Sequence, residues 1–215
     1  MTDDEEPQSG DSGFLHFFRT HPWAKRAVSV LSVVLLIGGV AMLAYPFATN
    51  LYQHRLQNKL SKELASPLLK QKYRNHSLGV GDSLTRIKMS AINVDVVVVE
   101  GTTPTALRAG AGHYAQTPLP CEKGNVAIAG HRTTYGKPFA DLDQLRVGDE
   151  VELDTPIGGC VYQLKKAPFI VDKADLSVLN QTPNQTLTLT SCHPKGSAAK
   201  RIIVQAVWVK DLQGA

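Results

Sequence analysis

The stretch Thr186-Leu187-Thr188-Leu189-Thr190-Ser191-Cys192 carries the strongest signal for the fold of this 215-residue chain. Threonine and leucine alternate with the period of two that a β-strand requires, so one face is apolar and the other carries hydroxyl groups. A second strand pattern, 201–209 (RIIVQAVWV), opens with Arg201, nine residues after the cysteine. We therefore expect a buried strand that ends in a cysteine, beside a strand that begins with an arginine. A thiolate near a fixed positive charge is a candidate nucleophile.

Further strand patterns fill the chain from residue 83 onward, punctuated by glycine and proline. Many short strands with few helices indicate a mainly β fold, either a closed barrel or a sandwich. The predicted strands are 83–90, 93–100, 125–132, 149–154, 160–171, 185–191 and 201–209, and the predicted short helices are 104–109, 137–145 and 174–180.

The N-terminal region contains a long apolar segment. Residues 27–48 carry no charge, and about 22 residues at about 1.5 Å each span roughly 33 Å, enough to cross a bilayer. The apolar core of a signal peptide is shorter, about 7–15 residues, and a cleavage site follows it. The segment is therefore predicted to be a retained transmembrane anchor, preceded by a cytoplasmic tail over 1–26.

Charge alone gives the orientation of this anchor only weakly. Lys25 and Arg26 adjoin it on the N-terminal side, and Arg55, Lys59 and Lys62 follow within the window that counts for topology. The raw count is a tie. The closer placement of Lys25 and Arg26 favours a cytoplasmic N-terminus and an extracellular C-terminal part.

The segment between the anchor and the β-rich region is predicted to be a helical stalk. Within 49–77, leucines recur at near-helical spacing, and Pro67 interrupts the pattern. The expected organisation is a tail over 1–26, an anchor over 27–48, a juxtamembrane helix or linker over 49–77 and a catalytic domain over 78–211.

Bulk composition excludes one class of partner. The formal net charge is +4, and charged residues make up 20% of the chain. A mildly basic chain suits an anionic surface such as a membrane or cell wall. No dense basic patch interleaved with aromatic residues occurs, so nucleic acid is not an expected partner.

Three histidines are candidates for the proton partner of Cys192. His131 closes the strand pattern 125–132, directly after Gly130, and so mirrors the cysteine at the end of a buried strand. His193 adjoins Cys192, but successive residues of a strand point to opposite faces. His113 lies in a segment that we interpret as a surface loop.

The three cysteines Cys121, Cys160 and Cys192 leave two alternatives open. In an extracellular domain, Cys121 and Cys160 could pair and leave Cys192 free, or all three could be unpaired. The sequence does not place the two Cα atoms within bridging distance.

These pieces together resemble a known family. The motifs 127–132 (AIAGHR) and 188–192 (TLTSC), with Arg201 after them, resemble the signature of sortases, the membrane-anchored cysteine transpeptidases of Gram-positive cell walls. The family motif is usually Thr-Leu-x-Thr-Cys, so Ser191 is a mild departure. The resemblance covers roughly 78–210, and the segments 112–114 (GHY), 124–136 (GNVAIAGHRTTYG) and 197–201 (SAAKR) are most similar to actinobacterial class E sortases, with class D second.

The resemblance implies an eight-stranded sortase-type β-barrel and a two-step reaction. The catalytic residues it implies are His131, Cys192 and Arg201, and Thr190, Ser191 and Tyr114 are candidates for substrate binding. The thiolate would attack the Thr–Gly bond of a C-terminal sorting signal on a secreted protein. A cell-wall amine such as lipid II would then resolve the thioacyl-enzyme. Class E resemblance implies a Leu-Ala-x-Thr-Gly signal, against Leu-Pro-x-Thr-Gly for class A. No metal or other cofactor is implied, and the family places the barrel outside the cell.

Other functions fit the sequence less well. A cell-wall L,D-transpeptidase typically has His and Gly just before its cysteine, whereas Ser191 stands there in this chain. A class C-type pilus-assembling sortase often carries an Asp-Pro motif near the start of the barrel, and none occurs in these 215 residues. A class D sortase remains an alternative, as does a non-enzymatic membrane-tethered β-barrel adaptor.

Overall fold

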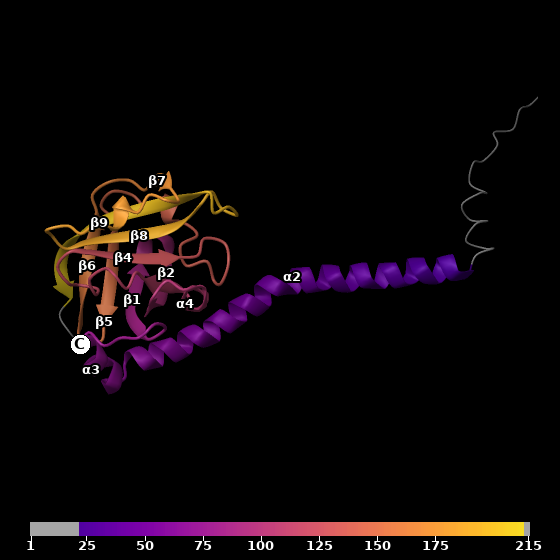
Figure 1. Cartoon of the computed structure of the whole chain (residues 1–215), viewed down its shortest axis with the longest axis horizontal. Coiled ribbons are helices and arrows are strands. Elements are labelled where there is room, and N and C mark those ends of the chain that lie inside the picture. The colour runs from indigo at the N-terminus through magenta and orange to yellow at the C-terminus, as the bar shows by residue number, and fades with distance from the viewer. Residues whose placement is uncertain (1–21, 213–215) are drawn as a thin grey trace, which may run out of the picture. The chain divides into compact units, whose positions relative to one another are not determined.

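The strands predicted from the sequence form a closed β-barrel. The computed structural model describes residues 22–212 (Figure 1). Eight strands follow one another in the order β6-β5-β1-β2-β3-β4-β8-β9, pairing between β6 and β9 closes the ring, and β7 adds to β9 as a ninth strand. The predicted eight-stranded barrel is therefore confirmed. The strands are β1 Ser83–Met89, β2 Val94–Glu100, β3 Ala111–His113, β4 Asn125–Gly130, β5 Glu150–Thr155, β6 Gly158–Leu164, β7 Phe169–Asp172, β8 Thr186–His193 and β9 Lys200–Leu212.

Helices are few within the β-rich region. α4 (Pro104–Ala109) begins where the Thr103 hydroxyl accepts a hydrogen bond from the Ala106 amide, a standard N-cap, with proline at the first position. The remaining helices are α2 Pro22–Leu64, α3 Pro67–Arg74, and the short 3-10 helices η1 Ser90–Ile92, η2 Leu142–Gln144 and η3 Ser177–Leu179.

The inside of the ring is filled by alternate residues of its strands. On β8, Leu187 and Leu189 are fully buried in this core, while Thr188 and Thr190 lie on the outer face. The alternation in the sequence thus reports correctly which face of the strand is which. Other strands contribute in the same way to the core, with Val126, Ile128, Ile202, Val204 and Ala206.

Four local predictions were wrong. The segment 160–171 is not one strand, because the chain leaves β6 at Leu164 and enters β7 only at Phe169. The predicted helices 137–145 and 174–180 shrink to η2 and η3, and β3 was missed. β3 has only three residues, too few for a periodic pattern to show.

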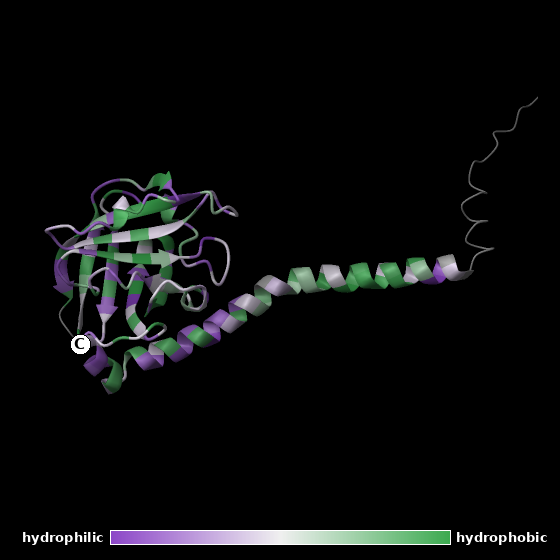
Figure 2. Ribbon diagram, viewed as in Figure 1, coloured by the Kyte–Doolittle hydropathy of each residue, from purple (hydrophilic) through white to green (hydrophobic). Residues whose placement is uncertain are grey.

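The chain divides into two units, Met1–Phe47 and Ala48–Ala215, and α2 runs through both. In the described part of the first unit, most of the helix carries hydrophobic colouring in Figure 2, with a hydrophilic band near its start, where Lys25 and Arg26 stand. Its apolar side chains are exposed, with Leu36 at 68%. This helix is long and apolar enough to cross a membrane.

In the second unit, the C-terminal half of α2 is part of the barrel's structure. Leu60 packs with Val97, Val99 and other buried residues of β2 and α4. The Gln57 amide accepts a hydrogen bond from the Val97 amide at 2.7 Å and donates to the Val97 carbonyl at 3.1 Å. Gln57 also donates to the carbonyl of Ala109 at 2.6 Å. It therefore satisfies backbone groups of β2 that the three-residue β3 does not reach.

Cys121 and Cys160 form a disulfide, with their Cα atoms 5.7 Å apart. This bond joins the turn before β4 to β6, and Cys192 is the free cysteine among the described residues. The structure thus decides between the two alternatives that the sequence left open.

Candidate active site

The pairing of β4, β8 and β9 determines where His131, Cys192 and Arg201 lie along neighbouring strands. β4 is parallel to β8, with Ala127 opposite Thr188 and Ala129 opposite Thr190. The same register extended by two residues aligns position 131 with position 192, and His131 is the first residue after the end of β4 at Gly130. The strands of such a sheet lie about 4.8 Å apart.

The arginine joins the row from the other side. β8 is antiparallel to β9, and Cys192 lies directly opposite Arg201. Directly opposed residues project from the same face of a sheet. We call His131, Cys192 and Arg201 the site row, because Cys192 is paired with Arg201 and His131 directly follows the strand that is paired with β8 on its other side.

His131 is half-buried, and its surroundings change its acidity. Burial lowers the pKa of His131 below its ordinary value, because the imidazolium loses water. The Tyr135 ring packs against it with centroids 5.3 Å apart. The His131 carbonyl accepts a hydrogen bond from the Phe139 amide. Gly130 allows this close approach, since a Cβ there would lie 2.6 Å from the Phe139 ring.

The Arg201 side chain is held by backbone rather than by an acid. Its Nη1 atom donates to the carbonyls of Ala198 at 3.1 Å and Lys200 at 3.0 Å. Over residues 22–212 it forms no ion pair with a carboxylate. A guanidinium has five N–H donors, so Arg201 has donors beyond those it uses on its own backbone.

The three residues expected to bind substrate lie differently. The Tyr114 and Thr190 hydroxyls are 3.2 Å apart, next to the site row on the outer face. Ser191 points the other way. Its hydroxyl is buried and donates to the carbonyl of Gly130 at 2.8 Å. The structure therefore brings Tyr114 and Thr190 to the site row and places the Ser191 side chain between β8 and β4.

A residue that sequence reasoning missed lies behind the site row. Arg132 is 3% exposed and bridges the ends of β4 and β8. Its Nη1 atom donates to the Cys192 carbonyl at 3.3 Å and to Nδ1 of His193 at 2.9 Å. Its Nη2 atom pairs with Asp143 at 2.9 Å, and its Nε atom donates to the Ala140 carbonyl. Arg132 adjoins His131 in sequence, and that adjacency was the available signal.

Two histidines considered from the sequence do not face Cys192. His193 projects to the opposite face of β8, as strand geometry requires. Its Nδ1 atom must accept from Arg132, because a guanidinium only donates, so Nε2 carries the hydrogen in the neutral ring. The surface-loop interpretation of His113 was wrong: it is fully buried in β3, 2.9 Å from Glu100.

The described residues hold no group of three or more His, Cys, Asp and Glu side chains that could bind a metal ion. The site row instead combines a thiol, an imidazole and a guanidinium. This set can supply a nucleophile, move a proton and stabilise a developing negative charge.

The fold is that of a known family. The sortase domain model matches residues 87–209, more than half of the chain, so the chain belongs to the sortase family. Sortase SrtE1 of Streptomyces coelicolor is 27% identical over 204 residues, which is 86% of this chain and 58% of the relative. Sortase D of Bacillus subtilis is 35% identical over 122 residues, 55% of this chain and 60% of the relative. The chain thus spans less than two thirds of the length of these two relatives.

A solved structure agrees with the sequence relatives. The Clostridium perfringens sortase D5 transpeptidase superposes with a TM-score of 0.64 at 29% identity, over 74% of this chain and 98% of that one. The relatives therefore include both classes, E and D, that the sequence motifs indicated.

Proposed function

We propose that this protein is a membrane-anchored sortase, a cysteine transpeptidase that joins secreted proteins to a cell-wall amine. The observation that carries the proposal is the strand register: Cys192 lies directly opposite Arg201, and β4, which ends one residue before His131, is paired in parallel with β8. Membership of the sortase family supports it.

In the first half-reaction, the Cys192 thiolate attacks the carbonyl carbon of threonine in the sorting signal. The carbonyl oxygen takes the negative charge, and Arg201 donates hydrogen bonds to it. The C–N bond to glycine then breaks, and the His131 imidazolium gives its proton to the leaving amine. The products are a thioacyl-enzyme and a free peptide with an N-terminal glycine.

The second half-reaction runs the same steps with a new amine. The amine of the acceptor, such as lipid II, attacks the thioester carbon and gives a proton to His131. The C–S bond breaks, and the thiolate returns. Burial lowers the pKa of His131, so in the free enzyme the imidazolium is less populated at neutral pH than in an exposed histidine. This agrees with activity through a less populated thiolate–imidazolium pair.

The residues beside the site row are proposed to contact the signal. Tyr114 and Thr190 present hydroxyl groups next to Cys192 on the outer face. Ser191 acts through its own strand, because its hydroxyl fixes β8 to the carbonyl that precedes His131. A Leu-Ala-x-Thr-Gly signal follows from the class E likeness.

The membrane topology is also a proposal. Residues 27–48 span the bilayer with the N-terminus in the cytoplasm, and the domain over 78–211 lies outside. A membrane-impermeant maleimide applied to intact cells tests this, because Cys192 is the free thiol among the described residues. Labelling that needs prior lysis would overturn the orientation.

The activity is tested with the full chain in detergent, Leu-Ala-x-Thr-Gly and Leu-Pro-x-Thr-Gly peptides, and a glycine-based amine. Cleavage at Thr–Gly with transfer to the amine is expected, faster with the first peptide. Cys192→Ala should abolish both steps, and His131→Gln should reduce them at least about a hundredfold. His54→Gln, on the exposed face of α2, is the matched control. Cleavage that persists in Cys192→Ala would sink the proposal.

A further inference from the structure

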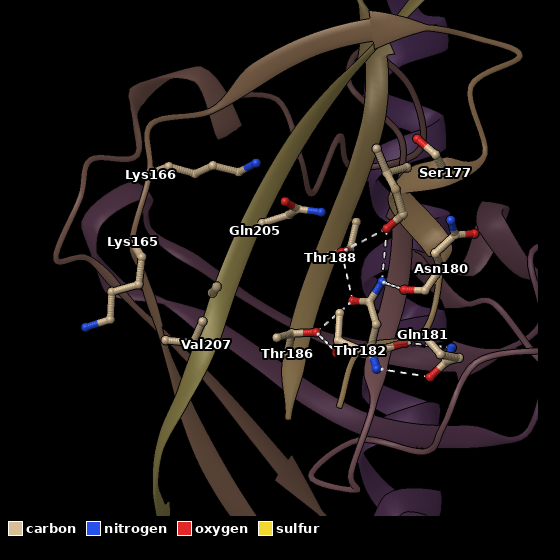
Figure 3. Close-up of a pocket in the computed structure, with 13 residues that line it drawn as sticks. Lys165, Lys166, Ser177, Asn180, Gln181, Thr182, Thr186, Thr188, Gln205 and Val207 are labelled. Atoms are coloured by element: carbon tan, nitrogen blue, oxygen red, sulfur yellow. Dashed lines mark hydrogen bonds between the residues drawn. The ribbon is translucent and has the colours of Figure 1, made fainter. Parts of the chain in front are cut away.

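The outer face that carries Cys192 continues into a cavity. This cavity has a volume of about 430 Å³, within the range of ligand pockets. Its floor consists of Thr186 and Thr188 of β8 with Gln205 and Val207 of β9, and η3 and the β6–β7 loop flank it (Figure 3). It is separate from the site row and has no role in the half-reactions described above.

Strand register gives the position of the cavity relative to the thiol. Thr188 and Gln205 are opposed residues, four positions along each strand from Cys192 and Arg201. Four residues of strand span about 13 Å, and six span about 20 Å. In an extended peptide whose threonine lies at Cys192, the leucine of the pentapeptide is three residues, or about 10 Å, away, and the residue before it reaches the near end of the cavity at about 13 Å. The residues before that leucine reach the rest of it.

The chemistry of transfer fixes which end of the substrate points this way. The acyl part stays attached through both half-reactions, whereas the leaving peptide departs and the acceptor amine must enter the place it vacates. We therefore expect a surface of paired strands that binds the acyl part of the substrate on one side of Cys192. On the other side we expect an open edge, where the leaving peptide departs and the acceptor amine enters. β8 ends at His193 and β9 begins at Lys200, so the paired strands lie only on the cavity side of the site row.

The wall formed by η3 is fixed before any substrate binds. The buried Asn125 side chain donates to the carbonyls of Val178 at 3.0 Å and Asn180 at 3.1 Å. Its oxygen accepts from the Thr188 hydroxyl at 2.8 Å. These bonds join η3 to β4 and β8, so little ordering is needed on binding.

The opposite wall is positively charged. Lys165 and Lys166 lie in the β6–β7 loop, and Figure 3 shows Lys166 extending toward Gln205 while Lys165 points away. The Lys166 ammonium lies 3.9 Å from the Phe169 ring centroid, and that of Lys165 donates to Gln163. Over residues 22–212, neither lysine forms an ion pair with a carboxylate. Asp175, near η3, is engaged by Ser177.

We infer that this cavity binds the residues that immediately precede the sorting pentapeptide, and that Lys166 selects an acidic side chain among them. The inference rests on the proposed function for the identity of the substrate. It adds a specificity element outside the pentapeptide: the enzyme reads about three further residues on the exported protein, and a carboxylate there pairs with Lys166 across the Gln205 floor.

The test measures binding, so that it does not depend on turnover. Full-length Cys192→Ala protein in detergent is titrated with fluorescent Leu-Ala-x-Thr-Gly peptides. Each peptide carries Glu, or the isosteric Gln, at one of the three positions before leucine. At low salt we expect about threefold tighter binding for Glu at the best position, the size of one partly exposed ion pair. High salt should remove this preference.

A second substitution identifies the lysine. Lys166→Gln, added to Cys192→Ala, should bring the Glu-to-Gln affinity ratio to one while the Gln peptide binds as before. Lys59→Gln, an exposed charge on α2, should leave the ratio at about three. Equal affinities for Glu and Gln at all three positions, or a preference that survives Lys166→Gln, would overturn the inference. If the preference is found but the enzyme with Cys192 intact cleaves no peptide, the proposed function fails and the cavity assignment stands.

Discussion

At the scale of single residues, Arg132 links the end of β8, which carries Cys192, to the segment after β4, which carries His131. It bonds to the Cys192 carbonyl and follows His131 directly, so the positions of the thiol and the imidazole depend on its planar fork. Arg132→Lys keeps the charge but loses the fork. We expect kcat for peptide cleavage to fall about tenfold or more, because small misplacements of reacting groups are costly. KM should change little.

Steady-state kinetics of the full chain measure this split. Arg146→Lys, an exposed arginine near η2, serves as the matched control and should behave as wild type. A loss in Arg132→Lys that appears only in KM would show that Arg132 acts on substrate binding instead.

His131 links stability to pH. Burial lowers its pKa in the folded state below the ordinary value of 6.5, so as pH falls through 6.5 the unfolded chain takes up the proton first. The free energy of unfolding contributed by this group therefore decreases as the pH is lowered below about 6.5. In urea titrations at pH 7.5 and 5.5, His131→Gln should lose less stability than wild type. An equal loss in both would contradict the assigned direction.

At the scale of elements, α2 completes the edge of β2. Replacing Gln57 by leucine keeps the volume but leaves the amide and carbonyl of Val97 and the Ala109 carbonyl without their partner. Each buried polar group that is left without a hydrogen-bond partner costs about 1–3 kcal/mol. We expect Gln57→Leu to lower the free energy of unfolding by at least about 2 kcal/mol, measured by urea denaturation.

Gln71→Leu, on the exposed face of α3, is the control for adding an apolar side chain to a helix. If Gln57→Leu and Gln71→Leu are equally stable, the hydrogen bonds of Gln57 contribute nothing to the barrel.

Periodicity predicted the elements that have enough residues to show it. The alternation over 186–192 predicted β8, its inward leucines and its outward cysteine, because the leucine face of that strand packs in the core of the barrel and the threonine face does not. β3 was missed because three residues hold no period. The interruption at 165–168 was missed because Lys165 and Lys166 fit an exposed strand edge as well as a loop.

Candidate site residues were predictable where a motif contained them. His131, Cys192 and Arg201 stand in recognisable sequence motifs, and the structure adds the pairing of Cys192 with Arg201 and of β4 with β8, which the sequence does not state. Arg132 was not predicted, because its importance depends on partners 60 and 61 positions away. Parallel pairing of β4 with β8 is a long-range property that no local pattern encodes.

At the scale of the whole molecule, the disulfide joins segments far apart in the ring. Cys121 and Cys160 are 39 residues apart, and closing a loop of that length in the unfolded chain corresponds to about 4 kcal/mol in the chain-entropy model. Replacing both cysteines by serine should therefore lower the free energy of unfolding by roughly 2–5 kcal/mol. Peptide cleavage at 25 °C should persist, because neither cysteine touches the site row.

Thermal unfolding with and without reductant gives an independent measure. The wild-type midpoint should fall on reduction, and that of the double serine variant should not respond. Loss of cleavage in a serine variant that remains folded would show that the disulfide also acts on the site.

The parallel pairing of β4 and β8 has a consequence for the order in which the domain folds during synthesis. Everything from β5 to β7 is synthesised between His131 and the strand that carries Cys192, and Arg201 comes later still, on the strand that closes the ring. Pairings between such distant segments form late and slowly. No partly made chain can hold nucleophile, proton partner and arginine together. The proposed activity therefore requires β9, the last strand, to pair with both β8 and β6.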